Sequence, residues 1–183
     1  MSKIRRICVY AGPGSGKSTL AAGLFSKFKI AGYDIEHVSE YVKTWAYQGY
    51  QPQSYDQLYI FAKQVHMEDA ALRHVDRIVT DCPLLMCCTY AQFYGFPVHK
   101  QLTDIACAFD EEFPALNLLI ERTVPYNGKG RYQSEDQAHE FDEILRENMK
   151  LCANGYETVR VDDFLGIVDL VQRRIEVADA LQM

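Results

Sequence analysis

The residues with the clearest chemical potential lie at positions 11–19, in the stretch Ala-Gly-Pro-Gly-Ser-Gly-Lys-Ser-Thr. A small residue, four variable positions and then Gly-Lys-Ser/Thr is the pattern of a phosphate-binding loop, although Ala11 stands where glycine is commoner. Its glycines let successive backbone N–H groups turn inward on a polyphosphate at the positive end of the following helix. The pattern predicts that the chain binds a nucleoside triphosphate, and the alternative is an ordinary glycine-rich turn.

Each polar residue of this loop has an expected role. The Lys17 ammonium can reach the β- and γ-phosphates, which makes it both a nucleotide-binding and a catalytic candidate. The Ser18 hydroxyl is a candidate ligand of Mg²⁺. The other residues expected to bind the nucleotide are Gly12, Gly14, Ser15, Gly16 and Thr19. We therefore expect ATP and Mg²⁺ as cofactors.

Two carboxylates follow apolar runs of the kind that form buried strands. Asp81 follows residues 77–80, and Glu40 follows residues 35–39. Ligands of open parallel sheets bind at the carboxyl ends of the strands, so both carboxylates are expected beside the phosphate-binding loop. We predict that Asp81 holds Mg²⁺, directly or through water. The alternative is a helix cap, because Cys82-Pro83 has the form of a helix start.

A basic stretch at residues 121–131 supplies a third kind of candidate. Arg122, Lys129 and Arg131 surround two flexible glycines in a net-acidic chain. We predict a lid over about residues 122–135 that folds over the triphosphate and excludes water. Arg122 and Arg131 are then catalytic candidates, and Lys129 and Arg131 nucleotide-binding ones. The alternative is a solvated loop.

The hydrophobic pattern supplies the elements that must position these residues. Predicted strands and helices alternate along the chain, which is typical of a parallel sheet with right-handed crossovers. The strands are expected at residues 4–10, 35–39, 77–80, 116–120 and 157–161, and the helices at 20–31, 52–74, 82–95, 97–109, 133–151 and 164–180. We predict a single α/β domain over residues 1–183: a three-layer P-loop NTPase fold with about five parallel strands, helices on both faces and a basic lid.

Composition bears on the size of the core, the kind of partner and the state of the cysteines. The chain has 183 residues, 48% of them hydrophobic, which suits one substantial core. Its formal net charge of -6 does not indicate a surface that binds nucleic acid or membranes. The six cysteines lack Cys-x-x-Cys spacing, and several lie in apolar runs, so we expect free thiols and a cytoplasmic location. The oligomeric state stays open, with a dimer as one arrangement.

Residues 39–45, Ser-Glu-Tyr-Val-Lys-Thr-Trp, resemble a segment of deoxyribonucleoside kinases in which a Glu closes the second strand and a Trp follows. The resemblance implies that Glu40 is the base for the accepting hydroxyl, although a carboxylate there can also cap a helix. Phe-Ala-Lys-Gln at 61–64 similarly implies that Gln64 binds a nucleobase. Four aromatic residues, Tyr41, Trp45, Tyr47 and Tyr50, are candidates to stack on an acceptor ring or to pack in the wall. The chain departs from that family in having Asp-Cys-Pro at 81–83 where Glu-Arg-Ser is expected, so one arginine is missing.

The later part of the chain is more similar to nicotinamide riboside kinases, which also carry an Asp after the third strand, a Tyr-rich helix and a basic lid containing Pro. Residues 126–133, with Glu135, also resemble the lid of small kinase-like P-loop proteins encoded by bacteriophages, some of which phosphorylate hydroxymethylated pyrimidines. These resemblances extend over most of the chain and consist in the spacing of the matching residues; only the phosphate-binding loop is specific on its own.

The expected function is therefore ATP-dependent transfer of the γ-phosphate to a hydroxyl of a nucleoside, nucleotide or related small acceptor. One alternative is a kinase that acts on a hydroxymethylated pyrimidine base within DNA, which would make nucleic acid a partner. Another is a P-loop ATPase or nucleotide sensor without an acceptor. A GTPase is disfavoured because the chain has no Asn-Lys-x-Asp sequence to read guanine, and a motor because it would need further domains.

Overall fold

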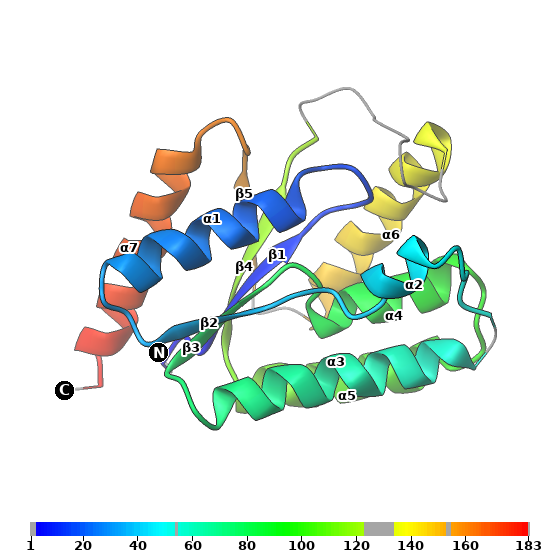
Figure 1. Ribbon diagram of the computed structural model, residues 1–183, viewed down its shortest axis with the longest axis horizontal. Coiled ribbons are helices and arrows are strands. Elements are labelled where there is room, and N and C mark those ends of the chain that lie inside the picture. Colours follow the sequence, from blue (N-terminus) through cyan, green and yellow to red (C-terminus); the bar gives the residue numbers. More distant parts are fainter. Residues whose placement is uncertain (1–2, 54, 123–133, 153–154, 183) are drawn as a thin grey trace.

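The computed structural model describes residues 3–53, 55–122, 134–152 and 155–182 (Figure 1). Within these residues, five parallel strands form one sheet in the order β2-β3-β1-β4-β5. The strands are β1 (Arg6–Tyr10), β2 (Ile35–Val38), β3 (Arg77–Thr80), β4 (Ala115–Ile120) and β5 (Glu157–Val159). The predicted parallel α/β sheet is confirmed.

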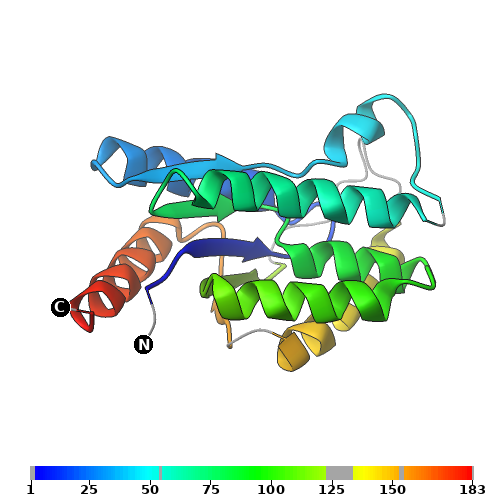
Figure 2. The same cartoon turned by 90° about the horizontal axis from the view of Figure 1, so that it is seen from below.

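Helices cover both faces of this sheet (Figures 1 and 2). Those in the described residues are α1 (Lys17–Ile30), α2 (Lys43–Tyr47), α3 (Asp56–Leu72), α4 (Leu84–Phe93), α5 (His99–Glu112), α6 (Glu135–Cys152) and α7 (Phe164–Ala180). Helix α2 was not predicted, because one turn is too short to show an apolar period and no side chain caps it. None of the helices that the structure describes is long and apolar enough to cross a bilayer.

The two faces of the sheet form two hydrophobic clusters. Successive side chains of a strand point to opposite faces, so β1 contributes to both clusters. Ile7 and Val9 pack with residues of α1 and α7, whereas Cys8 and Tyr10 pack with residues of α3, α4, α5 and α6. The three-layer P-loop NTPase fold follows from this arrangement.

The strand order brings the polar loop ends together. Strand β1 is central and pairs with β3, and β3 pairs with β2. Cys8 is paired with Thr80, and Thr80 with Val38, so the chain leaves all three strands at the same edge. The phosphate-binding loop, Asp81 and Glu40 therefore begin side by side, as the sequence predicts.

A buried ionic cluster joins β1 to α3 and α5. The Arg6 side chain is fully buried, donates from Nε to Glu68 Oε2 at 2.9 Å and also pairs with Asp110. Burial raises the pKa of both carboxyls, and the Arg6 charge opposes that shift. The cluster holds two carboxyls against one guanidinium, so the single positive charge cannot balance both when they are ionised.

Candidate active site

The loop between β1 and α1 has the backbone that phosphate binding requires. Gly14 and Gly16 have φ angles of 79° and 86°, a left-handed conformation that side chains rarely adopt. No side chain caps α1, so the first-turn N–H groups of the helix point into the loop. The buried Ser15 hydroxyl has no hydrogen-bond partner among the described residues. Unsatisfied donors at a helix N-terminus suit an anionic ligand.

Lys17 and Ser18 extend from the first turn of α1. The Lys17 ammonium donates to the carbonyl oxygens of Ala11 at 2.8 Å and Gly12 at 3.1 Å, which hold it at the loop. The Ser18 hydroxyl accepts a 3.4 Å hydrogen bond from the Lys43 ammonium. Thr19 is exposed on the following position of the helix. The roles of these residues in binding phosphate and Mg²⁺ remain predictions.

An ion pair fastens the same loop to α6. Asp142 accepts from the Gly12 N–H through Oδ1 at 2.7 Å, and its Oδ2 accepts from Arg122 Nε and Nη2 at 3.1 and 3.0 Å. Arg122 also donates to the Pro13 carbonyl at 3.1 Å. A Cβ on Gly12 would overlap the Asp142 carboxylate, so this glycine is required by packing.

Arg122 therefore lies against the loop with a structural partner. The sequence did not single out Asp142, because it is one of many acidic residues on a charged helix. Two further residues predicted for the lid, Lys129 and Arg131, lie outside the described residues.

Asp81 and Glu40 lie together at the carboxyl edge of the sheet. Asp81 directly follows β3, is 2% exposed, and accepts the Glu40 backbone N–H through Oδ1 at 3.0 Å. It therefore positions the start of the segment that carries Glu40. The Asp81 carboxylate and the Ser18 hydroxyl are both hard oxygen donors of the kind that Mg²⁺ prefers, so the residues fit such an ion.

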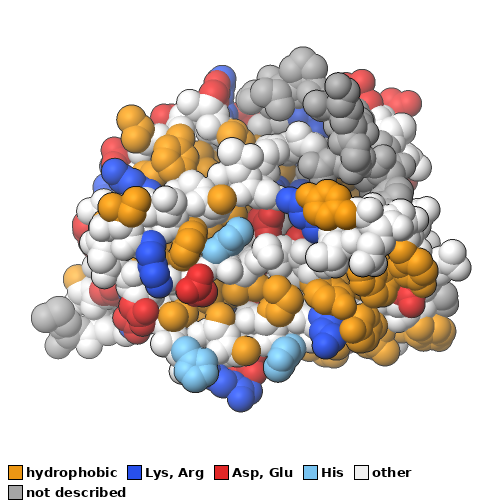
Figure 3. Space-filling model, in the orientation of Figure 1, with side chains coloured by type: hydrophobic (Ala, Val, Ile, Leu, Met, Phe, Trp, Pro, Cys, Tyr) orange, Lys and Arg blue, Asp and Glu red, His pale blue; other side chains and the backbone are white. Residues whose placement is uncertain are grey.

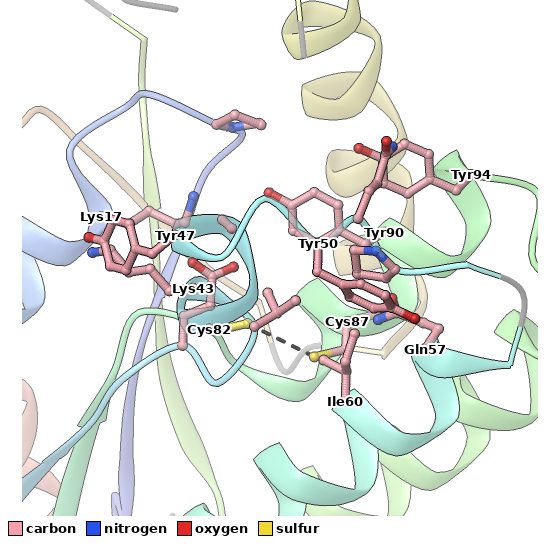
Figure 4. A pocket seen from close by; sticks show the side chains of 16 residues that line it. Lys17, Lys43, Tyr47, Tyr50, Gln57, Ile60, Cys82, Cys87, Tyr90 and Tyr94 are labelled. Carbon is pink, nitrogen blue, oxygen red and sulfur yellow. Dashed lines mark hydrogen bonds between the residues drawn. The ribbon is translucent and has the colours of Figure 1, made fainter. Parts of the chain in front are cut away.

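A pocket of about 320 Å³ opens beside the loop. Figure 4 shows Lys17 and Lys43 at one end of it and Tyr90 and Tyr94 at the other. The lining residues are Pro13, Lys17, Glu40, Val42, Lys43, Ala46, Tyr47, Tyr50, Gln51, Pro52, Gln57, Ile60, Cys82, Cys87, Tyr90 and Tyr94. The pocket thus has charged side chains at the end next to the phosphate-binding loop. The rest of its wall, which carries the tyrosines, comes mainly from α2, α3 and α4.

Two thiols form part of the pocket wall. Cys82 Sγ and Cys87 Sγ lie 3.9 Å apart, and Figure 4 marks this contact. Both cysteines are buried and free, and their mutual hydrogen bond together with burial raises the pKa of Cys82 well above its usual value. A buried thiol with a raised pKa is a poor nucleophile, so Cys82 acts as a small apolar group, and the buried Cys87 packs against it.

Gln64 is not among the residues that line this pocket, and its contact with a nucleobase stays a prediction. Its side chain is fully buried, and its Oε1 accepts the Tyr41 backbone N–H at 3.2 Å. Gln57, also on α3, lines the pocket instead and donates from Nε2 to the Cys87 carbonyl at 3.0 Å.

Tyr41 and Trp45 are likewise absent from the described lining of the pocket. They form an aromatic cluster with Tyr59. The Trp45 and Tyr59 rings are stacked with their centroids 6.0 Å apart, and the Tyr41 and Trp45 rings contact edge to face with their centroids 6.3 Å apart. Tyr41 and Trp45 therefore pack against neighbouring rings, and their stacking on an acceptor stays a prediction. Tyr47 and Tyr50, the other two candidates for stacking, do line the pocket, together with Tyr90 and Tyr94, which no sequence pattern singled out individually.

The fold and the loop define a P-loop domain, the class of protein that binds nucleotides through this backbone. Residues 6–164 match the model of a family described as AAA domain, and the chain belongs to this family, AAA_28. No curated protein matches the sequence.

Solved structures extend the comparison at the level of the fold. The structure of NadR in complex with NAD and AMP-PNP matches 94% of this chain with a TM-score of 0.70 and a sequence identity of 17%. The structure of NadR in complex with NR matches 92% of this chain with a TM-score of 0.68 and the same identity of 17%. The chain spans 49% of the length of each NadR chain. Deoxyadenosine kinase from M. mycoides, with dCMP and a flexible dCDP bound, matches with a TM-score of 0.55 and a sequence identity of 17%. The match covers 94% of this chain and 98% of the deoxyadenosine kinase chain. The resemblance to these kinase folds is confirmed.

Proposed function

We propose that the protein is an ATP-dependent kinase that transfers the γ-phosphate to a hydroxyl of a nucleoside, nucleotide or related small acceptor. The observation that carries the proposal is the shared pocket: Lys17 of the phosphate-binding loop and the carboxylate-bearing Glu40 line the same space as four tyrosines. An ATPase or sensor has no need of an aromatic chamber that continues from the phosphate end. The pocket volume, about 320 Å³, suits a small ligand.

In the proposed reaction the acceptor oxygen forms a bond to the γ-phosphorus while the bond to the β–γ bridging oxygen breaks, and ADP leaves. The acceptor proton passes to the Glu40 carboxylate, as general-base catalysis requires. Lys17 and the first-turn N–H groups of α1 hold the phosphates. Bound Mg²⁺ would neutralise phosphate charge, and Ser18 and Asp81 are the residues proposed to hold it. The whole chain acts as one catalytic domain in this proposal, with the lid at about residues 122–135.

The kinase-fold relatives support the choice of acceptor class. NadR structures contain NR or NAD with AMP-PNP, and the deoxyadenosine kinase structure contains dCMP and dCDP. These ligands belong to those proteins, and for this chain they define the panel of acceptors to be tried.

The test is transfer of labelled γ-phosphate from ATP to nicotinamide riboside, deoxyribonucleosides and nucleoside monophosphates. We expect at least one of them to be phosphorylated, and the Lys17→Ala variant to lose this activity while it remains folded by circular dichroism. Release of phosphate without a labelled acceptor would identify an ATPase, and nucleotide binding without turnover would identify a sensor. Transfer by Lys17→Ala at the wild-type rate would contradict the phosphate-binding role of the loop.

A second candidate, a kinase for hydroxymethylated pyrimidines within DNA, is favoured by one surface feature. Figure 3 shows hydrophobic side chains gathered over the α3 end of this face. Beside the pocket, Tyr47, Tyr55 and Tyr59 are 80%, 61% and 48% exposed. Exposed aromatic rings stack on the bases of single strands without reading their sequence. The net charge of -6 opposes this candidate.

The two candidates differ in what a tyrosine change does. With an oligonucleotide that carries hydroxymethylated pyrimidines as acceptor, the Tyr55→Ala/Tyr59→Ala variant should lose transfer if DNA is the substrate. Transfer to a free nucleoside should then be unaffected. If the wild type labels free nucleosides and leaves the oligonucleotide unlabelled, the second candidate is excluded.

A further inference from the structure

Lys43 is a second lysine at the phosphate end of the pocket, and the proposed transfer reaction gives it no role. It is the first residue of α2, lines the pocket, and donates from Nζ to Ser18 Oγ at 3.4 Å. Figure 4 shows it beside Lys17, at the end of the pocket away from Tyr90 and Tyr94. In the described part of the chain no carboxylate forms an ion pair with it.

The position of the Ser18 hydroxyl tells which part of a nucleotide Lys43 would meet. In a phosphate-binding loop this hydroxyl faces the Mg²⁺ that bridges the β- and γ-phosphates. Lys43 approaches it from the first turn of α2, whereas the Lys17 ammonium is held by carbonyls of the loop itself. Both ammonium groups line the same end of the pocket, Lys17 from the start of α1 and Lys43 from the segment that also carries Glu40.

The lysine side chain suits this place. It is a compact charge with three donors on a flexible stem, so it can leave a hydroxyl and follow a phosphate oxygen. Two cations repel each other, so a divalent cation held by Ser18 would displace the Lys43 ammonium, and the pocket that Lys43 lines is the adjoining space. The terminal phosphate has to face that same space if it is to meet an acceptor.

We propose that Lys43 is a catalytic residue that binds the terminal phosphate of the nucleotide from the acceptor side of the pocket. During transfer it gives up no proton: the acceptor oxygen bonds to the γ-phosphorus as the bridging oxygen leaves, and the charge of Lys43 stabilises the phosphoryl oxygens. The catalytic part of this inference rests on the proposed function, whereas the contact with the terminal phosphate does not.

The test compares nucleotides with and without that phosphate. Affinities for ADP and for AMP-PNP, each with Mg²⁺, are measured by calorimetry for the wild type, Lys43→Ala and Lys43→Arg. Loss of a charge-assisted hydrogen bond is expected to weaken AMP-PNP binding by Lys43→Ala about 10- to 100-fold. ADP binding should stay within about two-fold of wild type, because ADP lacks the group that Lys43 contacts. Lys43→Arg should restore much of the AMP-PNP affinity.

A matched control is Lys27→Ala, which removes an exposed lysine from the far end of α1. It should change neither affinity. An equal loss of ADP and AMP-PNP affinity in Lys43→Ala would overturn the proposal and assign Lys43 a role in shaping the loop. Unchanged affinity for both nucleotides would overturn it as well.

The outcome is separable from that of the kinase proposal. If the wild type phosphorylates no acceptor but Lys43→Ala still loses AMP-PNP selectively, the phosphate contact is supported and the transfer reaction is contradicted. If the wild type is a kinase and Lys43→Ala keeps both its turnover number and its AMP-PNP affinity, the kinase proposal is supported and the role of Lys43 is contradicted.

Discussion

At the scale of single residues, the pocket brings one carboxylate and two ammonium groups to a common end. Glu40, Lys17 and Lys43 all line it, Lys17 from the start of α1 and the other two from the segment that runs from β2 into the first turn of α2. Glu40 is also placed by its own backbone, whose N–H donates to Asp81. This hydrogen bond fixes the main chain of Glu40 at the pocket, and in the proposed reaction its carboxylate accepts the proton of the acceptor hydroxyl, so Glu40 is the residue whose change would distinguish a kinase from an ATPase.

Glu40→Gln is expected to lower acceptor phosphorylation by about 10² to 10⁴, the usual contribution of a positioned base. The amide has the same shape but cannot take up the acceptor proton. ATP affinity should be almost unchanged, and steady-state kinetics together with calorimetry measure both quantities. Glu36→Gln, at an exposed position on β2, is the control. A transfer rate within a few-fold of wild type would make Glu40 a structural or acceptor-binding residue.

Among the residues that the structure describes, no side chain caps α4, whose N-cap residue is Pro83, so the predicted helix-cap role of Asp81 is not seen. Asp81→Asn separates the proposed metal role from the hydrogen bond that this side chain accepts from the Glu40 backbone. The amide oxygen can still accept the Glu40 N–H, but the charge that attracts Mg²⁺ is lost. We expect a lower transfer rate that rises again as the Mg²⁺ concentration is increased, measured as a Mg²⁺ titration of activity. If the Mg²⁺ dependence matches that of wild type, Asp81 serves only to hold the Glu40 backbone.

At the scale of elements, α6 is tied to the phosphate-binding loop through Asp142. The carboxylate accepts both the Gly12 N–H and the Arg122 guanidinium, while Arg122 donates to Pro13. The Arg122 and Asp142 side chains are only 11% and 12% exposed, so solvent screens their pair weakly. The loop conformation therefore depends on a helix more than 100 residues later in the chain.

Asp142→Ala should lower the free energy of unfolding by about 1–3 kcal/mol, because it leaves the buried Gly12 N–H without its acceptor. It should also weaken ADP binding, since the loop loses one of its fixed points. Urea unfolding and calorimetry measure the two effects. Glu143→Ala removes an exposed carboxylate from the next position of α6 and should change neither. Full stability with full affinity in Asp142→Ala would show that the loop holds its shape alone.

At the scale of the whole molecule, the buried cluster of Arg6, Glu68 and Asp110 connects the central strand to two helices. Raised carboxyl pKa values mean that the folded state holds these protons more tightly than the unfolded state does. The resulting stability is fully present at low pH and is lost as the pH rises through the folded-state pKa. The pH range over which this stability is lost begins near the ordinary pKa values, 3.8 for Asp110 and 4.5 for Glu68.

Glu68→Gln should remove part of this pH dependence. The amide keeps the shape of the side chain but no longer titrates, and Asp110 remains as the carboxyl partner of Arg6. Relative to wild type, the variant should gain stability between about pH 5 and about pH 8. Urea unfolding at the two pH values measures it, with Glu176→Gln on the exposed face of α7 as the control. A constant difference between variant and wild type would show that Glu68 does not titrate in this range.

The sequence by itself determined the parts of the protein that depend on neighbouring residues. The loop at positions 11–19 requires glycine at left-handed positions, and both Gly14 and Gly16 adopt them. Asp81 and Glu40 were placed correctly because the residues after each strand of a parallel sheet emerge at one common edge. Local backbone preference and alternation are enough for such features.

Only the tertiary structure decided which side chains form the pocket. Gln57 and Gln64 lie two turns apart on the same buried face of α3, and a shift of about 10 Å along the helix separates the pocket from the interior. The prediction for Gln64 rests on a resemblance of residues 61–64 to deoxyribonucleoside kinases, and such a local match does not report where along α3 the pocket lies. The contact of Asp142 with Gly12 joins residues 130 positions apart. No local pattern encodes it, because the packing of α6 against the sheet brings the two together.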